Sequence, residues 1–490
     1  MEDSSDLMHQ RREKLEEIRT LGVNPYPYQY SPNYTTLAIH QQFEAIQETP
    51  DETRLVRIAG RIMTKRDHGK TSFAHLQDHK GQIQIYVRQN LVGEGAYQIY
   101  KKLDVGDIIG VAGFVFRTRT GEITVLANEV ELLSKSIRSL PEKWHGLQDK
   151  ETRYRQRYVD LIVNPDVRQV FINRTKITQA IRDYLNQQSF IEVETPILQP
   201  IYGGANARPF ITYHNTLDVS LYLRIADELY LKRLIVGGFD RVYEFSRDFR
   251  NEGMDRDHNP EFTMLELYQA YADYQDMMDL TEKLVVHTAK TVLGSTQISY
   301  QGDSISLEPP WRRLTMIEAI QEQTGINVES LSDEGLRDAT SRAGVELRGT
   351  ESRGHLIAEL FDTLVEPHII QPTFIYDYPI EISPLAKKKR GDERFVERFE
   401  FFMGRIETGN AFSELNDPID QRERFVEQAK RREVGDEEAF MMDEDYLRAL
   451  EYGMPPTGGL GIGIDRLTML LTDQSSIRDV ILFPQMRPER

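Results

Sequence analysis

The chain has 490 residues, of which 39% are hydrophobic and 28% charged, and it contains no cysteine. This length predicts two or three domains with sizeable cores, and the lack of cysteine excludes disulfides, a thiolate metal site and a cysteine nucleophile. No apolar run reaches about 18 residues and the N-terminus is acidic, so we expect a cytoplasmic protein with no membrane span and no secretory signal.

The net charge of −18 lies entirely in the later part of the chain. Residues 1–150 carry 20 basic and 20 acidic side chains, whereas residues 151–490 carry 40 basic and 58 acidic ones. Within the first part, residues 54–102 hold 10 basic and 3 acidic residues. The net charge alone argues against a nucleic-acid partner, but a locally basic module on an acidic body keeps that partner open.

The first 133 residues predict a helix followed by a small β-barrel. Residues 4–21 have the caps and thin apolar stripe of a charged helix. Residues 54–133 then break into five short strands with turn signals between them and a helical insert at 91–103. This pattern predicts an OB-type barrel, which binds single-stranded nucleic acid through a basic groove and stacking aromatics. The alternative is a structural barrel with a basic rim; we favour binding because the basic excess is confined to this module.

Residues 241–271 predict a strand, a polar loop and a second strand. Arg250 stands where the first strand meets the loop, and Phe262 stands in the second strand. An arginine can bind a phosphate through two N–H groups and a phenylalanine can stack on a base, so the hairpin suits a nucleotide; a solvated surface hairpin is the alternative. Upstream, a helix at 166–188 and a strand at 190–198, interrupted by Pro196, fit either a dimer interface or a sheet edge.

The C-terminal third holds two further segments with site character. Residues 399–416 predict a hairpin-like segment in which Glu400 and Glu407 can face one metal only if the strand bulges, at Gly404 or Gly409. Residues 455–472 are rich in glycine and lead into a helix near Asp465. Their spacing does not match G-x-G-x-x-G, so this segment is a weak phosphate cradle by spacing alone.

Taken together, these segments resemble the class II lysyl-tRNA synthetases of the bacterial type over essentially the full length. The resemblance rests on VETP at 193–196, RDFRNEG…RDHNPEFTMLELY at 247–268, NAFSELNDP at 410–418 and GLGIGIDRL at 459–467. The class I signatures H-x-G-H and K-M-S-K-S are absent.

The resemblance implies an α+β fold with two domains. Residues 1–145 would be an N-terminal helix plus an OB-fold anticodon-binding domain. Residues 146–490 would be a catalytic domain with a mostly antiparallel sheet of about six strands flanked by helices and a helical insertion near 311–365. The first signature would build a homodimer interface.

The resemblance also implies lysine, ATP and tRNA(Lys) as substrates, and Mg²⁺ as the cofactor. Arg250 and Arg466 would be the catalytic residues. ATP would be bound by these two arginines and by Glu252, His258, Asn259, Phe262, Glu400 and Glu407, the last two holding Mg²⁺. Lysine would be bound by Gly204, Glu228, Glu266, Tyr268, Asn410, Phe412 and Glu414. The anticodon would be read by Arg66, Phe73 and Gln84.

The residue chemistry agrees with lysine as the amino acid. A desolvated ammonium on a flexible stem needs carboxylates, a hydroxyl and an aromatic wall. Glu266 and Tyr268 share one strand face, and Asn410, Phe412 and Glu414 share another. One departure is visible. Members of the family often have Ala-Pro-Glu at this point, whereas this chain has Ala-Asp-Glu at 226–228.

Three alternatives stay open. An aspartyl- or asparaginyl-specific relative should present Arg or Lys in the pocket instead of acids. A paralogue that attaches lysine to a protein should lack the barrel of residues 54–133. A non-catalytic RNA-binding protein with a decayed synthetase domain should lack some of the site residues, all of which are present here.

Overall fold

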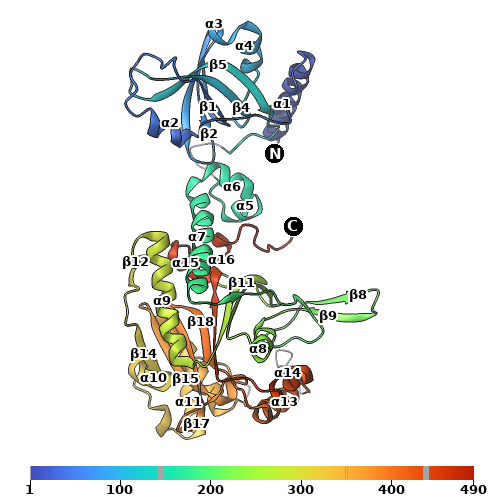
Figure 1. Ribbon diagram of the computed structural model, residues 1–490, viewed down its shortest axis with the longest axis vertical. Coiled ribbons are helices and arrows are strands. Elements are labelled where there is room, and N and C mark those ends of the chain that lie inside the picture. The colour runs from blue at the N-terminus through green and yellow to red at the C-terminus, as the bar shows by residue number, and fades with distance from the viewer. Residues whose placement is uncertain (1, 142–146, 348, 350, 434–440, 490) are drawn as a thin grey trace. The chain divides into compact units, whose positions relative to one another are not determined.

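A computed structural model of the protein describes residues 2–141, 147–347, 349, 351–433 and 441–489 (Figure 1). The chain divides into two compact units, Met1–Gln148 and Asp149–Arg490. The predicted domain boundary, between residues 145 and 146, lies outside the described residues. Within the described part, every helix is too short or too polar to cross a bilayer.

The first unit is a closed five-stranded barrel with strand order β1-β2-β3-β5-β4. Its strands are β1 (Val56–His68), β2 (Thr71–Gln77), β3 (Gln82–Arg88), β4 (Ile108–Arg117) and β5 (Ile123–Ser134). Its helices are α1 (Glu2–Thr20), α2 (Thr36–Gln42), α3 (Gln89–Val92) and α4 (Glu94–Lys101).

The barrel strands alternate between core and surface, which follows from the period of two in their sequence. On β2, Ala74 and Leu76 are buried in the barrel core, whereas Phe73 and His75 face outward. The same alternation buries Ile83, Ile85 and Val87 on β3. The outward positions are therefore free to carry binding side chains.

The second unit is built on a nine-stranded sheet of order β14-β15-β17-β18-β19-β11-β10-β6, with β16 paired to β17. The six strands from β15 to β10 are consecutively antiparallel, whereas the edge strands β14 and β6 run parallel to their neighbours. The strands are β6 (Ile191–Glu192), β10 (Arg241–Phe249), β11 (Glu261–Ala270), β14 (Arg312–Thr315), β15 (Thr373–Pro379), β16 (Lys388–Lys389), β17 (Asp392–Met403), β18 (Ile406–Ser413) and β19 (Thr457–Gly463). This confirms the predicted fold class, α+β with a mostly antiparallel synthetase sheet in one unit and an OB-fold barrel in the other.

Helices and two small sheets complete this unit. Helices α7 and α9 lie side by side (Figure 1), and their apolar faces share one core with the inner strands. The region predicted as a helical insertion holds α10, α11 and α12, which pack around a second hydrophobic core shared with β15 and β17. The helices are α5 (Lys150–Arg155), α6 (Arg157–Val163), α7 (Pro165–Gln187), α8 (Glu228–Val236), α9 (Tyr274–Leu293), α10 (Met316–Thr324), α11 (Asp333–Arg342), α12 (Arg353–Leu364), α13 (Pro418–Glu433), α14 (Glu444–Glu451), α15 (Ile464–Leu471) and α16 (Ile477–Val480). The small sheets are β12-β13 (Gln297–Tyr300, Asp303–Ser306) and β7-β9-β8 (Leu198–Gln199, Val219–Leu223, Ile211–His214).

The strand predicted at 190–198 is only partly formed. The chain pairs with β10 at Ile191 and Glu192, leaves the sheet before Pro196, and pairs again as β7 with β9. Proline cannot donate to a ladder, so it separates the two short strands.

The glycine-rich segment forms β19, a central strand between β11 and β18, and α15 follows it directly. A Cβ at Gly459 would lie 2.0 Å from a Glu414 oxygen, and one at Gly409 on the neighbouring strand would lie 2.5 Å from the Gly461 carbonyl oxygen. The glycines therefore serve close packing beside the cavity described next.

Candidate active site

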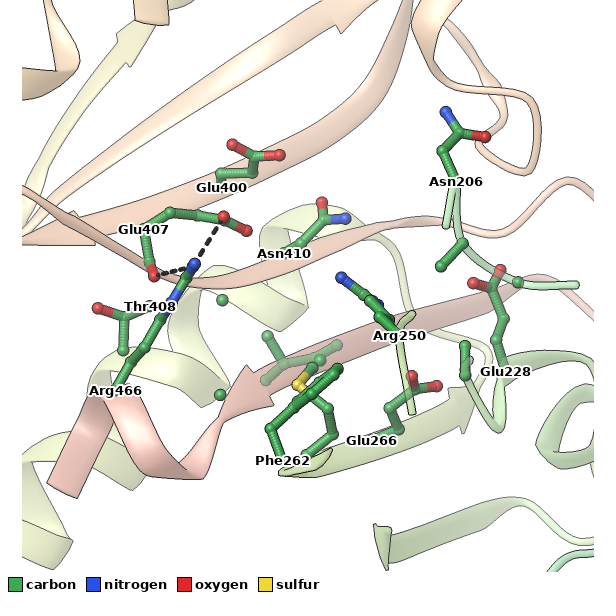
Figure 2. Close-up of a pocket in the computed structure, with 18 of the residues that line it drawn as sticks. Asn206, Glu228, Arg250, Phe262, Glu266, Glu400, Glu407, Thr408, Asn410 and Arg466 are labelled. Carbon is green, nitrogen blue, oxygen red and sulfur yellow. Dashed lines mark hydrogen bonds and ion pairs between the residues drawn. The ribbon is translucent and has the colours of Figure 1, made fainter. Parts of the chain in front are cut away.

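A cavity of about 410 Å³ opens over the central strands of the second unit. Its wall comes from β11, β17, β18 and β19, the loop between β10 and β11, the segments 204–206 and 382–386, and the start of α8 and α15. Every residue predicted to bind ATP or lysine lies on this wall. Figure 2 shows Glu228 and Glu266 on one side of Arg250, and Glu407 and Arg466 on the other. The cavity therefore has an acidic end and an arginine-bearing end.

The acidic end places carboxylates, a phenol and an aromatic ring around one space. Glu266 and Tyr268 project from the same face of β11, and the Tyr268 hydroxyl donates to Glu266 Oε2 at 3.0 Å. Glu228, from the first turn of α8, and Glu414, just after β18, are buried beside them. Phe412 lines the same end. These groups match the requirements of a desolvated ammonium.

A lysine of the chain itself lies among these acids. Lys232 is fully buried one helical turn after Glu228, and its Nζ contacts Glu228 Oε1 at 2.5 Å and also pairs with Glu414. Burial lowers the pKa of Lys232, but the two carboxylates outweigh it and raise the pKa above its ordinary value. The sequence analysis missed Lys232, although its i,i+4 spacing from Glu228 was a usable signal.

Gly204 gives the acidic end part of its space. Its φ of +90° is left-handed, and a Cβ there would lie 3.0 Å from Ala226 Cβ and 3.2 Å from Glu228 Cβ. A side chain at this position would be strained and would crowd Glu228.

The arginine-bearing end has the groups that an adenosine phosphate needs. The Arg250 guanidinium lies over the Phe262 ring at 5.0 Å, and its buried Nε has no hydrogen-bond partner in the described part of the chain. Arg466 donates to the Glu407 carboxylate at 3.0 Å and to its carbonyl oxygen at 2.8 Å. Arg250 is therefore left with donor capacity toward the cavity.

The loop between β10 and β11 carries the remaining predicted ATP residues. Glu252 and His258 are exposed on the cavity wall, and Arg466 Nη2 lies 3.3 Å from His258 Nε2. Asn259 is buried, and both ends of its side-chain amide are satisfied. The Nδ2 group donates to the Glu261 carbonyl oxygen at 2.6 Å, and Oδ1 accepts from the Gln485 N–H at 3.2 Å. Its side chain thus fixes the loop against the C-terminal segment.

A β-bulge brings Glu400 and Glu407 to the same cavity. Glu400 on β17 pairs with Asn410 on β18, and the register then shifts so that Thr408 is extra. The extra residue reverses the facing of Glu407, which joins Glu400 on the cavity wall. The bulge lies next to Gly409, one of the two positions named from the sequence, and Gly404 lies in the turn between the strands.

The two acids at the bulge have opposite electrostatic environments. Burial, and then the charge of Glu407, raises the pKa of Glu400. Burial also acts to raise the pKa of Glu407, but Arg466, together with Arg398 and Arg250, outweighs it and the pKa lies below its ordinary value. Behind them, burial and the same two acids raise the pKa of Asp362 to about 8 and that of Glu366 to about 7. This concentration of negative charge suits a divalent cation with oxygen ligands.

Arg398 and Tyr378 hold Glu400 in place and were also missed from the sequence. Arg398 donates to Glu400 Oε1 at 2.6 Å and to Asn410 Oδ1 at 3.0 Å, while the Tyr378 hydroxyl donates to Glu400 Oε2 at 2.8 Å. Arg398 stands two positions before Glu400 on the same strand face, which was a weak signal; Tyr378 comes from β15, and nothing in the sequence connects it to the site.

The three residues predicted to read an anticodon share the outer face of the barrel. Arg66 on β1 lies opposite Phe73 on β2 in the strand register. The Phe73 ring stacks on Tyr86, with ring centroids 4.3 Å apart and an angle of 10° between the planes. Two pairs along, on the same face, Gln84 lies opposite His75. Gln84 Nε2 donates to Glu122 at 2.7 Å, and its Oε1 accepts from Thr124 at 2.8 Å. The face thus combines a cation, stacked rings and oriented polar groups.

Comparison with known proteins agrees with this architecture. Residues 149–487 match the family described as tRNA synthetases class II (D, K and N), and residues 56–133 match the OB-fold nucleic acid binding domain. The chain therefore belongs to the class II tRNA synthetases, as the sequence motifs predicted.

Individual relatives of the chain point to a narrower group within the class II tRNA synthetases. The chain is 58% identical to a protein of Carboxydothermus hydrogenoformans over 99% of both chains, and 57% identical to one of Moorella thermoacetica over 100% of this chain and 99% of the other. A Staphylococcus epidermidis protein is 56% identical over 99% of both chains. All three are named Lysine--tRNA ligase.

Proposed function

We propose that this protein is a lysine–tRNA ligase that activates lysine with ATP and transfers it to the 3′ end of tRNA(Lys). The observation that carries the proposal is the two-ended cavity, with the carboxylates of Glu228, Glu266 and Glu414 at one end and the guanidinium groups of Arg250 and Arg466 at the other. The full-length relatives of this name support it.

The lysine substrate would place its positive charge among the acids of the cavity. Glu228, Glu266 and Glu414 supply negative charge, and Tyr268 and Phe412 supply a phenol and an apolar wall. Lys232 already pairs with Glu228 and Glu414, so Glu266 is the acid with the most unbalanced charge. Gly204 leaves the space beside Glu228 open, and Asn410 lies between the two ends (Figure 2).

ATP would occupy the other end. Phe262 offers a ring for the adenine, and Arg250 and Arg466 offer charge to the phosphates. Glu252, His258 and Asn259 would support the nucleotide from the loop, His258 through its contact with Arg466 and Asn259 by fixing the loop.

The donor set fits Mg²⁺. Glu400 and Glu407 would hold it, because both line the cavity and their mutual repulsion is reflected in the raised pKa of Glu400. When bound, Mg²⁺ would neutralise phosphate charge. Arg398 and Tyr378 keep the Glu400 carboxylate in position for this role.

The reaction needs no protein nucleophile. The lysine carboxylate attacks the α-phosphorus of ATP, the bond to the bridging oxygen breaks, and pyrophosphate leaves. The ribose hydroxyl at the tRNA 3′ end then attacks the carbonyl carbon of the lysyl-adenylate, and AMP leaves. Arg250 neutralises charge that develops on the α-phosphate, and Arg466 does so on the leaving pyrophosphate, so catalysis rests on positioning and charge stabilisation.

The barrel would read the anticodon. Phe73, stacked on Tyr86, offers a ring face to a base, and Arg66 lies beside it for a phosphate. Gln84 is held by Glu122 and Thr124, so its amide is oriented.

We also propose that the protein acts as a cytoplasmic homodimer. The segment predicted to form the interface exposes apolar side chains at Ile191, Ile197 and Leu198. Light scattering on the purified protein should give twice the chain mass, and Leu198→Asp should halve it; a wild-type monomer at micromolar concentration would contradict the dimer.

The test of the function is ATP–pyrophosphate exchange with each of the twenty amino acids in the presence of Mg²⁺. Exchange with lysine alone, followed by lysine-specific charging of tRNA(Lys), is the expected result. Exchange with aspartate or asparagine would replace the substrate assignment. The absence of both exchange and charging would overturn the proposed function.

A further inference from the structure

Three buried carboxylates meet behind the lysine end of the cavity. Asp227, Asp248 and Glu266 come from the residue before α8, from β10 and from β11, and one oxygen of each lies within 4.8 Å of the others. Asp227 and Asp248 have no solvent exposure, and Glu266 is 7% exposed. Glu266 lines the cavity, whereas Asp227 lies behind it.

The buried cations around this cluster are already matched to other acids. Arg224 donates to Glu244 at 2.7 Å and pairs with Asp248 at 3.3 Å. Lys232 pairs with the two acids on its own side of the pocket, Glu228 and Glu414. In the described part of the chain, neither Asp227 nor Glu266 has an ion-pair partner, and the two are left facing each other.

Helix capping does not account for Asp227. An aspartate before a helix usually accepts from the first-turn N–H groups, yet Asp227 makes no such bond to α8. Both of its carboxylate oxygens are buried without a hydrogen-bond partner among the described residues. Glu266 receives a single hydrogen bond, from the Tyr268 hydroxyl.

Two ionised carboxylates that lie close together without a cation repel strongly in a buried site, and one shared proton relieves both. An O–H on one then donates to the other, which satisfies oxygens that otherwise have no partner. Consistent with this, burial and the neighbouring acids raise the pKa of Glu266 to about 8 and hold the pKa of Asp227 well above its usual range.

We propose that Asp227 is a positioning residue that shares a proton with Glu266 in the free enzyme, and that binding of the lysine ammonium beside Glu266 releases this proton to solvent. The inference rests on the proposed function, since lysine is the ligand. The ammonium replaces the proton as the positive charge that balances the pair. Asp227 thereby makes the affinity for lysine depend on pH.

The sign follows from the proton count. The free enzyme holds the proton and the complex does not, so lysine affinity rises with pH over roughly pH 6 to 8, by up to about tenfold per pH unit where one proton is released. The other charged and titratable groups that face the pair are Arg224, Glu228, Lys232, Glu244, Asp248, Arg250, Tyr268 and Glu414. Burial raises the pKa of Asp248 to about 6 against the charge of Arg224, so the proton release assigned to the pair is measured at pH 7 and above, where Asp248 is ionised.

Calorimetric titration of the full-length protein with lysine, in two buffers of different ionisation enthalpy, measures the protons released. At pH 7 we expect the wild-type protein to release between about half a proton and one proton per lysine. Asp227→Asn should release few or none, because its amide donates to Glu266 and keeps it ionised. Its KM for lysine in pyrophosphate exchange should become nearly independent of pH between 6 and 8, with little change in kcat.

Asp338→Asn, at an exposed position on α11, removes a carboxylate elsewhere and should release as many protons as the wild type. If Asp227→Asn fails to fold, Asp227→Ser serves as the second variant, with the same expected loss of proton release. Equal proton release by the wild-type and Asp227 variants would overturn the inference.

Proton release that appears only after a metal chelator is added would also overturn it, by showing a cation in the cluster. Lysine binding with no proton release would overturn the inference alone. Absence of lysine binding together with absence of lysine-dependent exchange would overturn the proposed function as well.

Discussion

The cavity of the catalytic unit and the outer face of the barrel both use charged and aromatic side chains, but at opposite degrees of exposure. Behind the cavity wall Lys232 is fully buried between two acids, and carboxylates of the wall have strongly shifted pKa values. On the barrel Arg66 is exposed beside a stacked pair of rings. Water screens the exposed charges and not the buried ones, so a single substitution should matter far more in the cavity than on the barrel.

The largest effect is expected from removing the buried cation. Lys232→Met leaves Glu228 and Glu414 without their shared partner and should lower the free energy of unfolding by about 3–5 kcal/mol. Without the cation, the pKa of each acid rises further in the folded state, so the variant binds more protons folded than unfolded. Its stability should therefore fall as pH rises from about 5 to 8. Denaturant unfolding at pH 5 and 8 measures this.

A matched double variant checks the cause. Lys232→Met with Glu414→Gln removes one charge of each sign and should recover part of the lost stability. If Lys232→Met is as stable as the wild type at pH 8, the buried pairing does not have the strength that its burial indicates.

Next comes Arg250, which lines the cavity and whose buried Nε has no hydrogen-bond partner among the described residues. Arg250→Ala should reduce the rate of ATP–pyrophosphate exchange by about 10²–10³-fold, the usual cost of losing one charge-stabilising group in a transition state. The far-ultraviolet circular dichroism and the midpoint of thermal unfolding should stay near wild-type values. Arg250→Lys keeps the charge but loses the forked geometry and should fall between the two. Near-normal exchange by Arg250→Ala would contradict the assignment.

On the barrel a smaller, selective effect is expected. Phe73→Ala should weaken the use of tRNA by about 1–3 kcal/mol, as a rise in KM for tRNA, through loss of stacking, and should leave exchange without tRNA unchanged. Phe73→Tyr preserves the ring over Tyr86 and should retain most of the affinity. An equal loss in ATP–pyrophosphate exchange would show that the barrel does not bind tRNA independently of the activation step.

The sequence predicted the larger features because they depend on local patterns. The barrel strands alternate with period two, and ordered motifs identified the class II family, which the full-length relatives confirm. The glycines of β19 gave no strand signal, because their role is close packing against neighbouring side chains such as Glu414, just after β18.

Details that depend on register or on distant contacts were out of reach. The bulge at Thr408 was predicted from the need of Glu407 to face the cavity, but the sequence left two positions for it, Gly404 and Gly409, and only the register of β17 and β18 places it beside Gly409. Asp362 reaches the site from α12 and Tyr378 from β15, and neither is linked to Glu400 by any spacing in the chain. Asp227 stood out in the sequence, but its burial against Glu266 is a property of the fold.

The smallest effect, and the sharpest contrast with Lys232, is expected at Arg66. Because this side chain is exposed, Arg66→Ala should cost less than about 1 kcal/mol in tRNA binding. It should also reduce the slope of log affinity against log salt concentration by about one, if the arginine neutralises one phosphate. Arg66→Lys keeps the charge and should keep the slope. Lys283→Ala, an exposed cation on α9, should leave the slope unchanged. Titrations of tRNA between about 50 and 200 mM salt decide this, and an unaltered slope for Arg66→Ala would mean that this charge does not meet the nucleic acid.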